Sequence, residues 1–444
     1  MVREDRISKW PNDILISIIS RLNIKEATST SVLSTCWRYL HHYVHHLDFP
    51  KYRYGIHDLS NYVSMVDHVL ESHRGSRIKE LVVDMYDHDH RGYNGHFEKW
   101  FDFALTKKAE IIHLDSVHQR HECPFLRLTN PNGLKCVKDL YLSEVTMTDQ
   151  DFELLVSNCL SLECFTIESP SELSTVSIVG LSKLKYVNLS DIWEVESIVI
   201  CDVISLVSLK LYNLSVGCVF QLSNIPKLAK LDFQESCTQL MLAEFLAKIP
   251  SRIHDQLQLM RLSTKSHNDF FPHGVDLVNI QHLELVLDIQ DSAYDSDLLS
   301  YAFSTEMCYS KMLDITQRCS MFAMYFREVG DIELPIKYFE ITGYLGSTWE
   351  RKLASYVIRN ATALQNLTVV SCDQGALSRA RLDFQHTPSV HYSVGATFSG
   401  QDEFYEYEKE KQWWTADSPT SSPSPPATSM CSTSCPQRNV QASD

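Results

Sequence analysis

The chain lacks any excess of positive charge, because 40 Lys and Arg stand against 56 Asp and Glu in 444 residues, a formal net charge of −16 at pH 7. Nucleic acids and anionic membranes attract basic surfaces, so neither is expected as the main partner. No apolar h-region follows Met1, and no apolar run approaches the ~20 residues of a membrane span. These absences predict a soluble intracellular protein without a nucleic-acid or membrane partner.

Paired cysteines and complete metal motifs are also missing. The 13 cysteines occur singly and without CxxC spacing, which is typical of reduced thiols in a cytoplasmic and/or nuclear protein. Histidines at helical spacing, His41 with His45 and His42 with His46, lack the third and fourth ligands of a zinc site. We therefore expect neither a metal nor a cofactor.

Motifs of catalysis are absent as well. The sequence contains no G-x-S-x-G, P-loop, dinucleotide-binding glycine fingerprint or HExxH motif. The carboxylates Asp288 and Asp291 lie in a polar stretch where nothing marks them as an acid–base pair. The sequence therefore predicts a protein without catalytic residues of its own.

What the chain does contain, near its start, is a short and strongly apolar helical segment. Apolar residues recur at helical spacing over residues 12–22, after a proline that suits a first helical turn. Residues 25–33 predict a second helix, and Ser34 is expected to cap a third over residues 34–44. About forty residues cannot bury this much apolar surface alone, so the segment needs a partner or a larger body.

The same segment resembles an F-box of the plant type, in order and with the usual spacing. The resemblance is carried by Trp10-Pro11, Asp13-Ile14-Leu15, Ile18, Leu22, Ala27, Ser31-Val32-Leu33-Ser34, Trp37-Arg38 and Leu40. It implies docking on a Skp-type adaptor and, through it, a link to a cullin ubiquitin ligase. It implies the following adaptor-binding residues: Trp10, Pro11, Ile14, Leu15, Ile18, Leu22, Val32, Leu33, Trp37 and Leu40.

Three positions depart from the family pattern. Trp10, Cys36 and His41 stand where the family usually has Leu, Arg and Trp. Trp10 is still large and apolar, so we still expect docking on the adaptor. The sequence does not determine the affinity of that docking. The alternative for the whole segment is a generic helical cap on a larger domain.

Beyond this segment a pattern of the form L-x-x-L-x-L returns along the chain. Its central residues 165, 187, 209 and 231 follow one another at steps of 22, and steps of 26 lead on to Leu257 and Leu283. The pattern occurs again at residues 336–341 and 364–369. A period of 20–29 residues with this pattern indicates leucine-rich repeats, in which each unit adds one short strand and an outer segment.

The predicted fold class is therefore an α/β solenoid, a leucine-rich-repeat horseshoe, with an N-terminal three-helix F-box and a disordered C-terminal tail. Lys337–Tyr344, Trp349–Asn360 and Ala363–Leu367 resemble the FBD segment that closes many plant F-box/leucine-rich-repeat proteins. The predicted division is an F-box at 5–46, leucine-rich repeats at 47–290, a helical insertion or degenerate repeat at 291–335, FBD-like repeats at 336–372, an irregular acidic-aromatic segment at 373–414 and a disordered Ser/Thr/Pro-rich tail at 415–444.

In such repeats, the variable residues beside each central apolar residue point to the concave face. Aromatic residues mixed with charges on such a face are typical of protein-binding surfaces. The candidate substrate-binding residues are Tyr141, Thr166, Glu168, Tyr186, Asn188, Lys210, Tyr212, Lys230 and Asp232. A solvated sheet face explains much of the same set, so the substrate stays unidentified at this level.

Two functions follow from these features. The first is a substrate-recognition subunit of an SCF-type cullin ubiquitin ligase, which binds a target protein through the repeats and acts by proximity. The alternative is a leucine-rich-repeat binding scaffold outside any ligase. Adaptor binding discriminates between the two.

Overall fold

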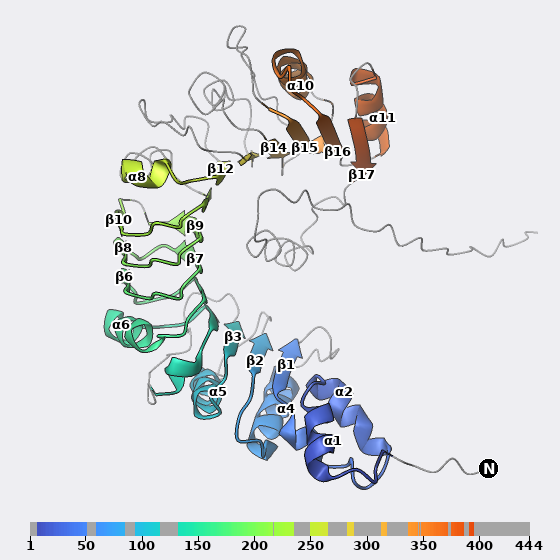
Figure 1. The fold of residues 1–444 in the computed structure, drawn as a ribbon, viewed down its shortest axis with the longest axis vertical. Coiled ribbons are helices and arrows are strands. Elements are labelled where there is room, and N and C mark those ends of the chain that lie inside the picture. Colours follow the sequence, from blue (N-terminus) through green and yellow to red (C-terminus); the bar gives the residue numbers. More distant parts are fainter. Residues whose placement is uncertain are drawn as a thin grey trace, which may run out of the picture.

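The architecture comes from a computed structural model, which describes residues 7–50, 59–84, 94–115, 132–215, 217–234, 249–264, 282–287, 312–317, 336–344, 346, 348–371, 374–385 and 390–394. Sequence predictions for 415–444, and those for most of 291–335, fall outside these residues. Figure 1 shows the described part as an arc of stacked units, with the N-terminal helices at one end.

One long parallel sheet lines the inner side of the arc (Figure 1). Its 14 strands follow one another in chain order, apart from the three that form a second sheet. The strands are β1 (His46–Pro50), β2 (Glu80–Asp84), β3 (Ile111–Asp115), β4 (Asp139–Ser143), β5 (Cys164–Glu168), β7 (Tyr186–Ile192), β9 (Ser208–Leu214), β11 (Lys230–Gln234), β12 (Leu259–Thr264), β13 (His282–Leu287), β14 (Met312–Gln317), β15 (Tyr338–Tyr344), β16 (Asn366–Ser371) and β17 (Val390–Val394). Parallel pairing in sequence order fits the regular repeat, because each unit contributes one strand to the sheet.

The register of this sheet follows the apolar pattern of the sequence. The central residues Phe165, Val187, Leu209 and Leu231 are Cα partners across neighbouring strands, and each is buried. Alternation along the strands places the residues on either side of them on the opposite face. The strand positions predicted from the 22-residue steps are therefore confirmed.

The unit after β11 begins three residues later than the sequence pattern suggested. Met260, not Leu257, is the Cα partner of Leu231 and Leu283. Leu257 precedes the strand and is buried, so it takes the first apolar position of the pattern Leu257-x-x-Met260-x-Leu262. The prediction that Leu257 is the central residue of this unit was wrong, because methionine fills a core position as well as leucine does.

The outer side of the arc changes with repeat length (Figure 1). The first units carry the helices α4 (Leu59–Ser72), α5 (Asn94–Thr106) and α6 (Asp149–Asn158), with the 3-10 turn η3 (Gly133–Cys136) before β4. The 22-residue units instead carry β6 (Thr175–Val179), β8 (Ser197–Cys201) and β10 (Val219–Ser223), which form a second parallel sheet. Alternating patterns such as Thr175-Val176-Ser177-Ile178 favour strands, whereas the repeat pattern alone predicted a helical or irregular outer segment.

Sharp turns recur at the same place in successive units. Glu144 and Ser169 directly follow β4 and β5, and Asp191 and Asn213 are the second-last residues of β7 and β9. All four have left-handed backbone angles, with φ of 55°, 47°, 52° and 48° in chain order. The amide of Asn213 donates a hydrogen bond to the carboxylate of Asp191 one unit earlier. Asn and Asp tolerate this conformation better than most residues, so the turn is stabilised by side chains that stack from unit to unit.

The N-terminal segment contains two α-helices, α1 (Asn12–Ile19) and α2 (Ile24–Ser29), where three helices were predicted. The predicted second helix stops at Ser29 and continues as the 3-10 turn η1 (Thr30–Val32). The hydroxyls of Thr28, Ser29 and Thr30 donate to backbone carbonyls of the same helix, a competition that weakens helices. The third predicted helix is a series of turns ending in η2 (Leu40–Tyr43).

The C-terminal part adds strands that the sequence pattern missed. β14 pairs with both β13 and β15, so residues 312–317, in the range predicted as a helical insertion or degenerate repeat (291–335), form a strand of the sheet and not a helix. Helices α8 (Ser251–His254) and α10 (Thr348–Asn360) cover the outer side, and α11 (Gln374–Asp383) with β17 extends the order into a range expected to be irregular.

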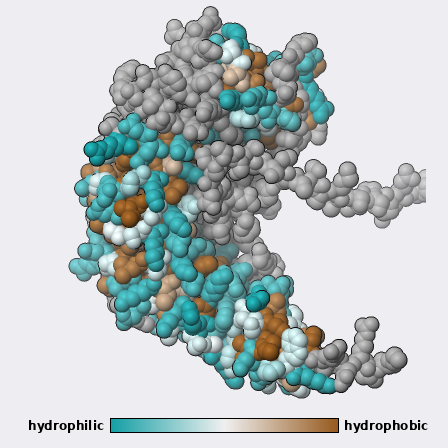
Figure 2. Space-filling view, viewed as in Figure 1, coloured by the Kyte–Doolittle hydropathy of each residue, from teal (hydrophilic) through white to brown (hydrophobic). Residues whose placement is uncertain are grey.

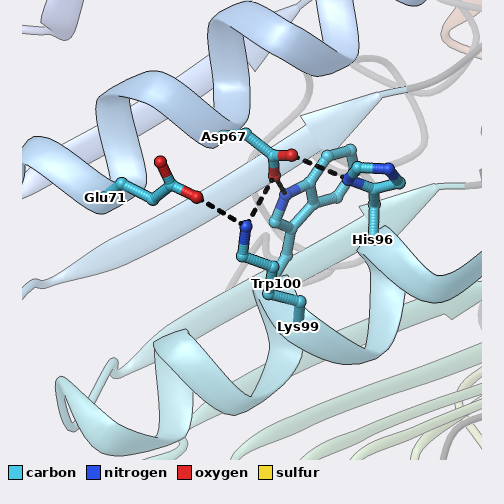
Figure 3. Close-up of polar contacts among 5 residues, drawn as sticks. All are labelled: Asp67, Glu71, His96, Lys99 and Trp100. Atoms are coloured by element: carbon cyan, nitrogen blue, oxygen red, sulfur yellow. Dashed lines mark hydrogen bonds and ion pairs between the residues drawn. The ribbon is translucent and has the colours of Figure 1, made fainter.

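Helices α4 and α5 are joined by a polar network on the outer side (Figure 3). The indole of Trp100 donates to Asp67 at 2.8 Å, and His96 Nδ1 lies 2.8 Å from the other oxygen of the same carboxylate. Lys99 Nζ contacts Glu71 at 2.9 Å and Asp67 at 3.6 Å. Because Trp100 is fully buried, its indole both fills the core and satisfies its own donor.

Candidate docking surfaces

An exposed apolar patch covers the N-terminal helices, where Figure 2 shows brown atoms gathered over α1 and α2. Val32 and Leu33 are 85% and 62% exposed, and Trp10 and Ile14 are 48% and 46% exposed. Burying large apolar side chains of this kind is the main source of affinity at protein interfaces. We call Trp10, Ile14, Val32 and Leu33 the apolar patch.

Hydrogen bonds hold the two halves of the apolar patch together. The indole of Trp37 donates to Ser8 Oγ at 3.0 Å, and Ser8 Oγ lies 2.9 Å from Ser34 Oγ. The segment with Trp10 is thereby fixed beside the segment with Leu33. The capping box of α2, between Asn23 and Glu26, orients the helix that leads to Val32.

The structure divides the predicted adaptor-binding residues by exposure. Trp10, Pro11, Ile14, Val32 and Leu33 are exposed, Ile18 and Leu22 are partly exposed, and Leu15, Trp37 and Leu40 are buried in the core. Two further exposed apolar residues, Ile7 and Tyr39, border the same region of the sequence. These two residues are not among the positions that match the F-box motif. They could have been predicted only because they are large apolar residues next to matched positions.

The N-terminal helices continue directly into the sheet. β1 starts at His46, pairs with β2 along its whole length, and buries Leu47 and Phe49. His73 Nε2 contacts the carbonyl of Val44 at 2.9 Å, and burial lowers the pKa of His73 to about 4. The apolar patch therefore sits on the same continuous core as the repeats.

The concave face carries the predicted substrate-binding residues in rows. The register places Tyr141, Thr166, Asn188 and Lys210 in one row across β4, β5, β7 and β9, with Asp232 next on β11. Tyr186 lies one row earlier, level with Cys164, and Glu168 and Tyr212 lie one row later, level with Ser190. Tyr141, Tyr186 and Tyr212 thus lie in three different rows.

Exposure differs along these rows. Tyr141, Thr166, Glu168, Tyr186, Asn188 and Tyr212 are partly exposed. Lys210 and Lys230 are 7% exposed and Asp232 is 0% exposed, and Arg261 Nη1 lies 3.7 Å from Asp232 Oδ2. The middle of the face therefore holds buried charges that pack within the chain, whereas its first half offers accessible side chains.

That first half is strongly acidic. The outward positions of β1–β5 carry six carboxylates, Asp48, Glu80, Asp84, Asp115, Asp139 and Glu168, which we call the acidic face. All six are partly exposed. The hydroxyl of Tyr141 donates to Glu168 at 2.9 Å in its midst.

Asp115 lies beside Asp84, its register partner on the neighbouring strand, so the two carboxylates repel each other when both are ionised. Burial, and then the charges of Asp84 and Glu168, raise the pKa of the Asp115 carboxyl well above its usual range. A raised pKa in the folded state means that stability is highest below the unfolded pKa and is lost as pH rises through the folded pKa. An aspartate at this position therefore contributes less stability at neutral pH than at acidic pH.

We expect Asp115→Asn to raise the melting temperature at neutral pH, with the gain shrinking as pH falls toward the ordinary pKa of aspartate. Thermal unfolding followed by circular dichroism at several pH values measures this. Glu153→Gln, a matched change on the exposed side of α6, is the control and should leave the curve unchanged. A lower melting temperature for Asp115→Asn at neutral pH would contradict the assignment.

Two other kinds of site are absent from the described residues. Over these ranges, no group of three or more His, Cys, Asp or Glu side chains is arranged to hold a metal ion. Within the same ranges, no helix has the length and apolar character needed to cross a bilayer.

Comparison with known proteins places two family models on the chain. The model described as "FBD-associated F-box protein At5g56370, LRR repeats" matches residues 66–248, and the FBD model matches residues 335–369. The first covers β2 to β11 and the helices between them, and the second covers β15, α10 and most of β16.

Curated relatives come from Arabidopsis thaliana. F-box/FBD/LRR-repeat protein At1g51370 is 34% identical over 181 residues, 36% of this chain and 40% of that protein. Putative FBD-associated F-box protein At1g78730 is 29% identical over 180 residues, 39% of its length. The chain thus spans about two fifths of these two relatives, whereas F-box/LRR-repeat protein 13 is 25% identical over 89% of its length.

These matches indicate leucine-rich repeats followed by an FBD segment. The repeat and FBD matches, with the relatives, support a plant F-box protein of the F-box/FBD/LRR type. This agrees with the resemblance seen in the sequence.

Proposed function

We propose that the chain is a substrate-recognition subunit of an SCF-type cullin ubiquitin ligase. In this proposal residues 5–46 form an F-box that docks on a Skp-type adaptor, and the parallel sheet with its outer helices is a leucine-rich-repeat solenoid that binds a target protein. The relatives carry F-box and LRR-repeat in their names, which supports such a role. The chain supplies no bond chemistry and acts by raising the local concentration of its target.

The apolar patch carries this proposal. Val32 and Leu33 stay largely exposed, although the core beneath them has buried Leu15, Trp37 and Leu40. A small helical module gains stability by covering such side chains with a partner. An apolar groove between adaptor helices would cover them and leave the core residues in place.

The continuous core between patch and repeats supports the same proposal. β1 joins the patch-bearing segment to the first repeat without a linker, and Arg74 N and Lys79 N donate to the carbonyls of His42 and His45. A substrate on the concave face would then be held at a fixed position relative to the adaptor. Fixed geometry increases the effective concentration at one site.

We further propose a location in the cytoplasm and/or nucleus, where the ubiquitin machinery acts. The cysteines with a described state, Cys36, Cys136, Cys159, Cys164, Cys201 and Cys218, are all free thiols. Reduced thiols suit these compartments.

The deciding experiment is co-expression of the full chain with a plant Skp-type adaptor, followed by size-exclusion chromatography. A stoichiometric complex is the expected result. Failure of the wild-type chain to bind any such adaptor, while it remains folded by circular dichroism, would favour the non-ligase leucine-rich-repeat scaffold instead.

A further inference from the structure

Trp10 belongs to a short segment that the core does not hold. Residues 7–10 precede α1 and form turns, and none of the four is buried. The backbone N–H of Trp10 donates to the carbonyl of Ile7 at 2.9 Å, a bond within the segment itself. Helix α1, which follows, is different, because its Leu15 and Ile19 are fully buried. Apolar packing therefore fixes the helix but not the segment with Trp10.

Three side chains tie this segment to the other half of the apolar patch. Ser8 is two residues before Trp10, and Ser34 directly follows Leu33. The hydroxyls of Ser8 and Ser34 form a hydrogen bond at 2.9 Å, and the indole N–H of Trp37 donates to Ser8 Oγ at 3.0 Å. We call Ser8, Ser34 and Trp37 the serine clasp. Because it joins residues 26 and 29 positions apart, it sets where one half of the patch lies relative to the other.

Burial makes the serine clasp costly to open. Trp37 is 5% exposed, so its indole N–H has little access to water. If Ser8 moved away, this donor would lose its acceptor in a largely dry place, which is unfavourable. Ser8 and Ser34 are themselves only partly exposed, so water competes weakly for the bond between them. The clasp is therefore a stable feature of the free chain.

Trp10 is the side chain whose placement depends on the clasp. It is 48% exposed and stands where the F-box family usually has Leu. Tryptophan is among the residues that contribute most to protein interfaces when it fills a pocket of the partner. A side chain already held in its bound position loses less conformational freedom on binding, which raises affinity. A large ring on an unfixed segment would lose that advantage.

We propose that the serine clasp positions Trp10 for docking on the Skp-type adaptor, so that Trp10 and Leu33 enter the partner together. This rests on the proposed function, because the adaptor is the partner in question. The three residues of the clasp are positioning residues: they act through Trp10 and need not touch the adaptor.

The test is a binding titration of the full chain with a purified plant Skp-type adaptor, arranged as a double-mutant cycle. Ser34→Ala opens the clasp, Trp10→Ala removes the side chain that the clasp places, and a third variant carries both changes. Ser34→Thr keeps the hydroxyl. Ser20→Ala is the control, because the Ser20 hydroxyl donates locally, to the carbonyl of Ser17 in α1 at 3.1 Å.

We expect Trp10→Ala to weaken adaptor binding at least about tenfold and Ser34→Ala to weaken it about fivefold. In the Trp10→Ala background, Ser34→Ala should change the affinity by less than about twofold, because no ring is left to place. Ser34→Thr and Ser20→Ala should both bind like the wild type.

Trypsin cleavage after Lys9 measures the segment without any partner. The bond between Lys9 and Trp10 lies inside residues 7–10, and a protease cuts it only when the segment opens. Ser34→Ala should be cut there about threefold faster than the wild type, and Ser20→Ala at the wild-type rate. Equal rates in all three proteins would overturn the inference, since the segment would then be held without the clasp.

Failure of this inference and failure of the ligase role give different results. If the wild type captures the adaptor but Trp10→Ala or Ser34→Ala leaves the affinity unchanged, this inference is overturned and the ligase role stands. The same holds if Ser34→Ala weakens binding equally with and without Trp10. If the wild type captures no adaptor, the ligase role and this inference both fail.

Discussion

Changing Val32 and Leu33 together to Asp should abolish capture of a Skp-type adaptor, with affinity reduced by at least about 100-fold. Both side chains are among the most exposed large apolar residues described, so their replacement leaves the core intact. Charges at the centre of an apolar interface would have to be buried without partners, which is strongly unfavourable. The measurement is a binding titration with purified adaptor.

The matched control is Leu382→Asp. Leu382 is also a largely exposed leucine, but it lies on α11 at the far end of the sheet. The control should bind the adaptor like the wild type, and both variants should melt like it. Undiminished capture by the Val32/Leu33 variant would refute the apolar patch as the docking surface.

Leu15→Asp, although it falls within the same sequence motif, is not a valid test of docking. Leu15 is fully buried, and a carboxylate there would unfold the helices. Only the structure separates the residues of the motif that face the partner from those that hold the fold.

Replacing Trp100 by Ala should lower the free energy of unfolding by about 3–5 kcal/mol. The side chain is fully buried between α4 and the first strands, and its indole donates to Asp67 (Figure 3). Trp100→Phe keeps most of the volume and loses the hydrogen bond, so we expect a loss of only about 1–2 kcal/mol. Urea unfolding followed by circular dichroism measures both.

Trp193→Ala is the control, because Trp193 is 44% exposed and should cost less than about 1 kcal/mol. If Trp100→Ala and Trp193→Ala were equally mild, the packing of α5 against α4 would not contribute as described. Loss of adaptor capture is not expected in either Trp variant below its unfolding transition.

The sequence determined where most inner strands lie, because a strand buried on one face must place an apolar residue at every second position. The register of the strands could therefore be predicted directly from the spacing of Phe165, Val187, Leu209 and Leu231. The same logic failed at Met260, because Leu257 and Leu259 also fit the last two apolar positions of the pattern. It failed again at β14, whose pattern in Met312–Gln317 is too short to be told from a helix.

The candidate surfaces were predicted unevenly. The F-box motif named the exposed Val32 and Leu33 together with the buried Trp37 and Leu40, since both kinds are apolar in sequence. Lys210, Lys230 and Asp232 have the charge of surface residues yet are buried on the concave face. The periodicity of a sequence predicts which face of the sheet a residue lies on, but not whether its side chain is exposed to solvent.

The sequence by itself thus determined the class of repeat and the resemblance to a docking module, because both depend on local spacing. Three features could be learned only from the tertiary structure. They are the 3-10 turns that replace the third helix, the second outer sheet, and the side-by-side placement of Asp84 and Asp115. The second sheet and the placement of the two carboxylates depend on contacts between residues far apart in the chain. The sequence shows that the chain is acidic overall, but only the structure shows that stacking of the strands places six carboxylates at one end of the concave face.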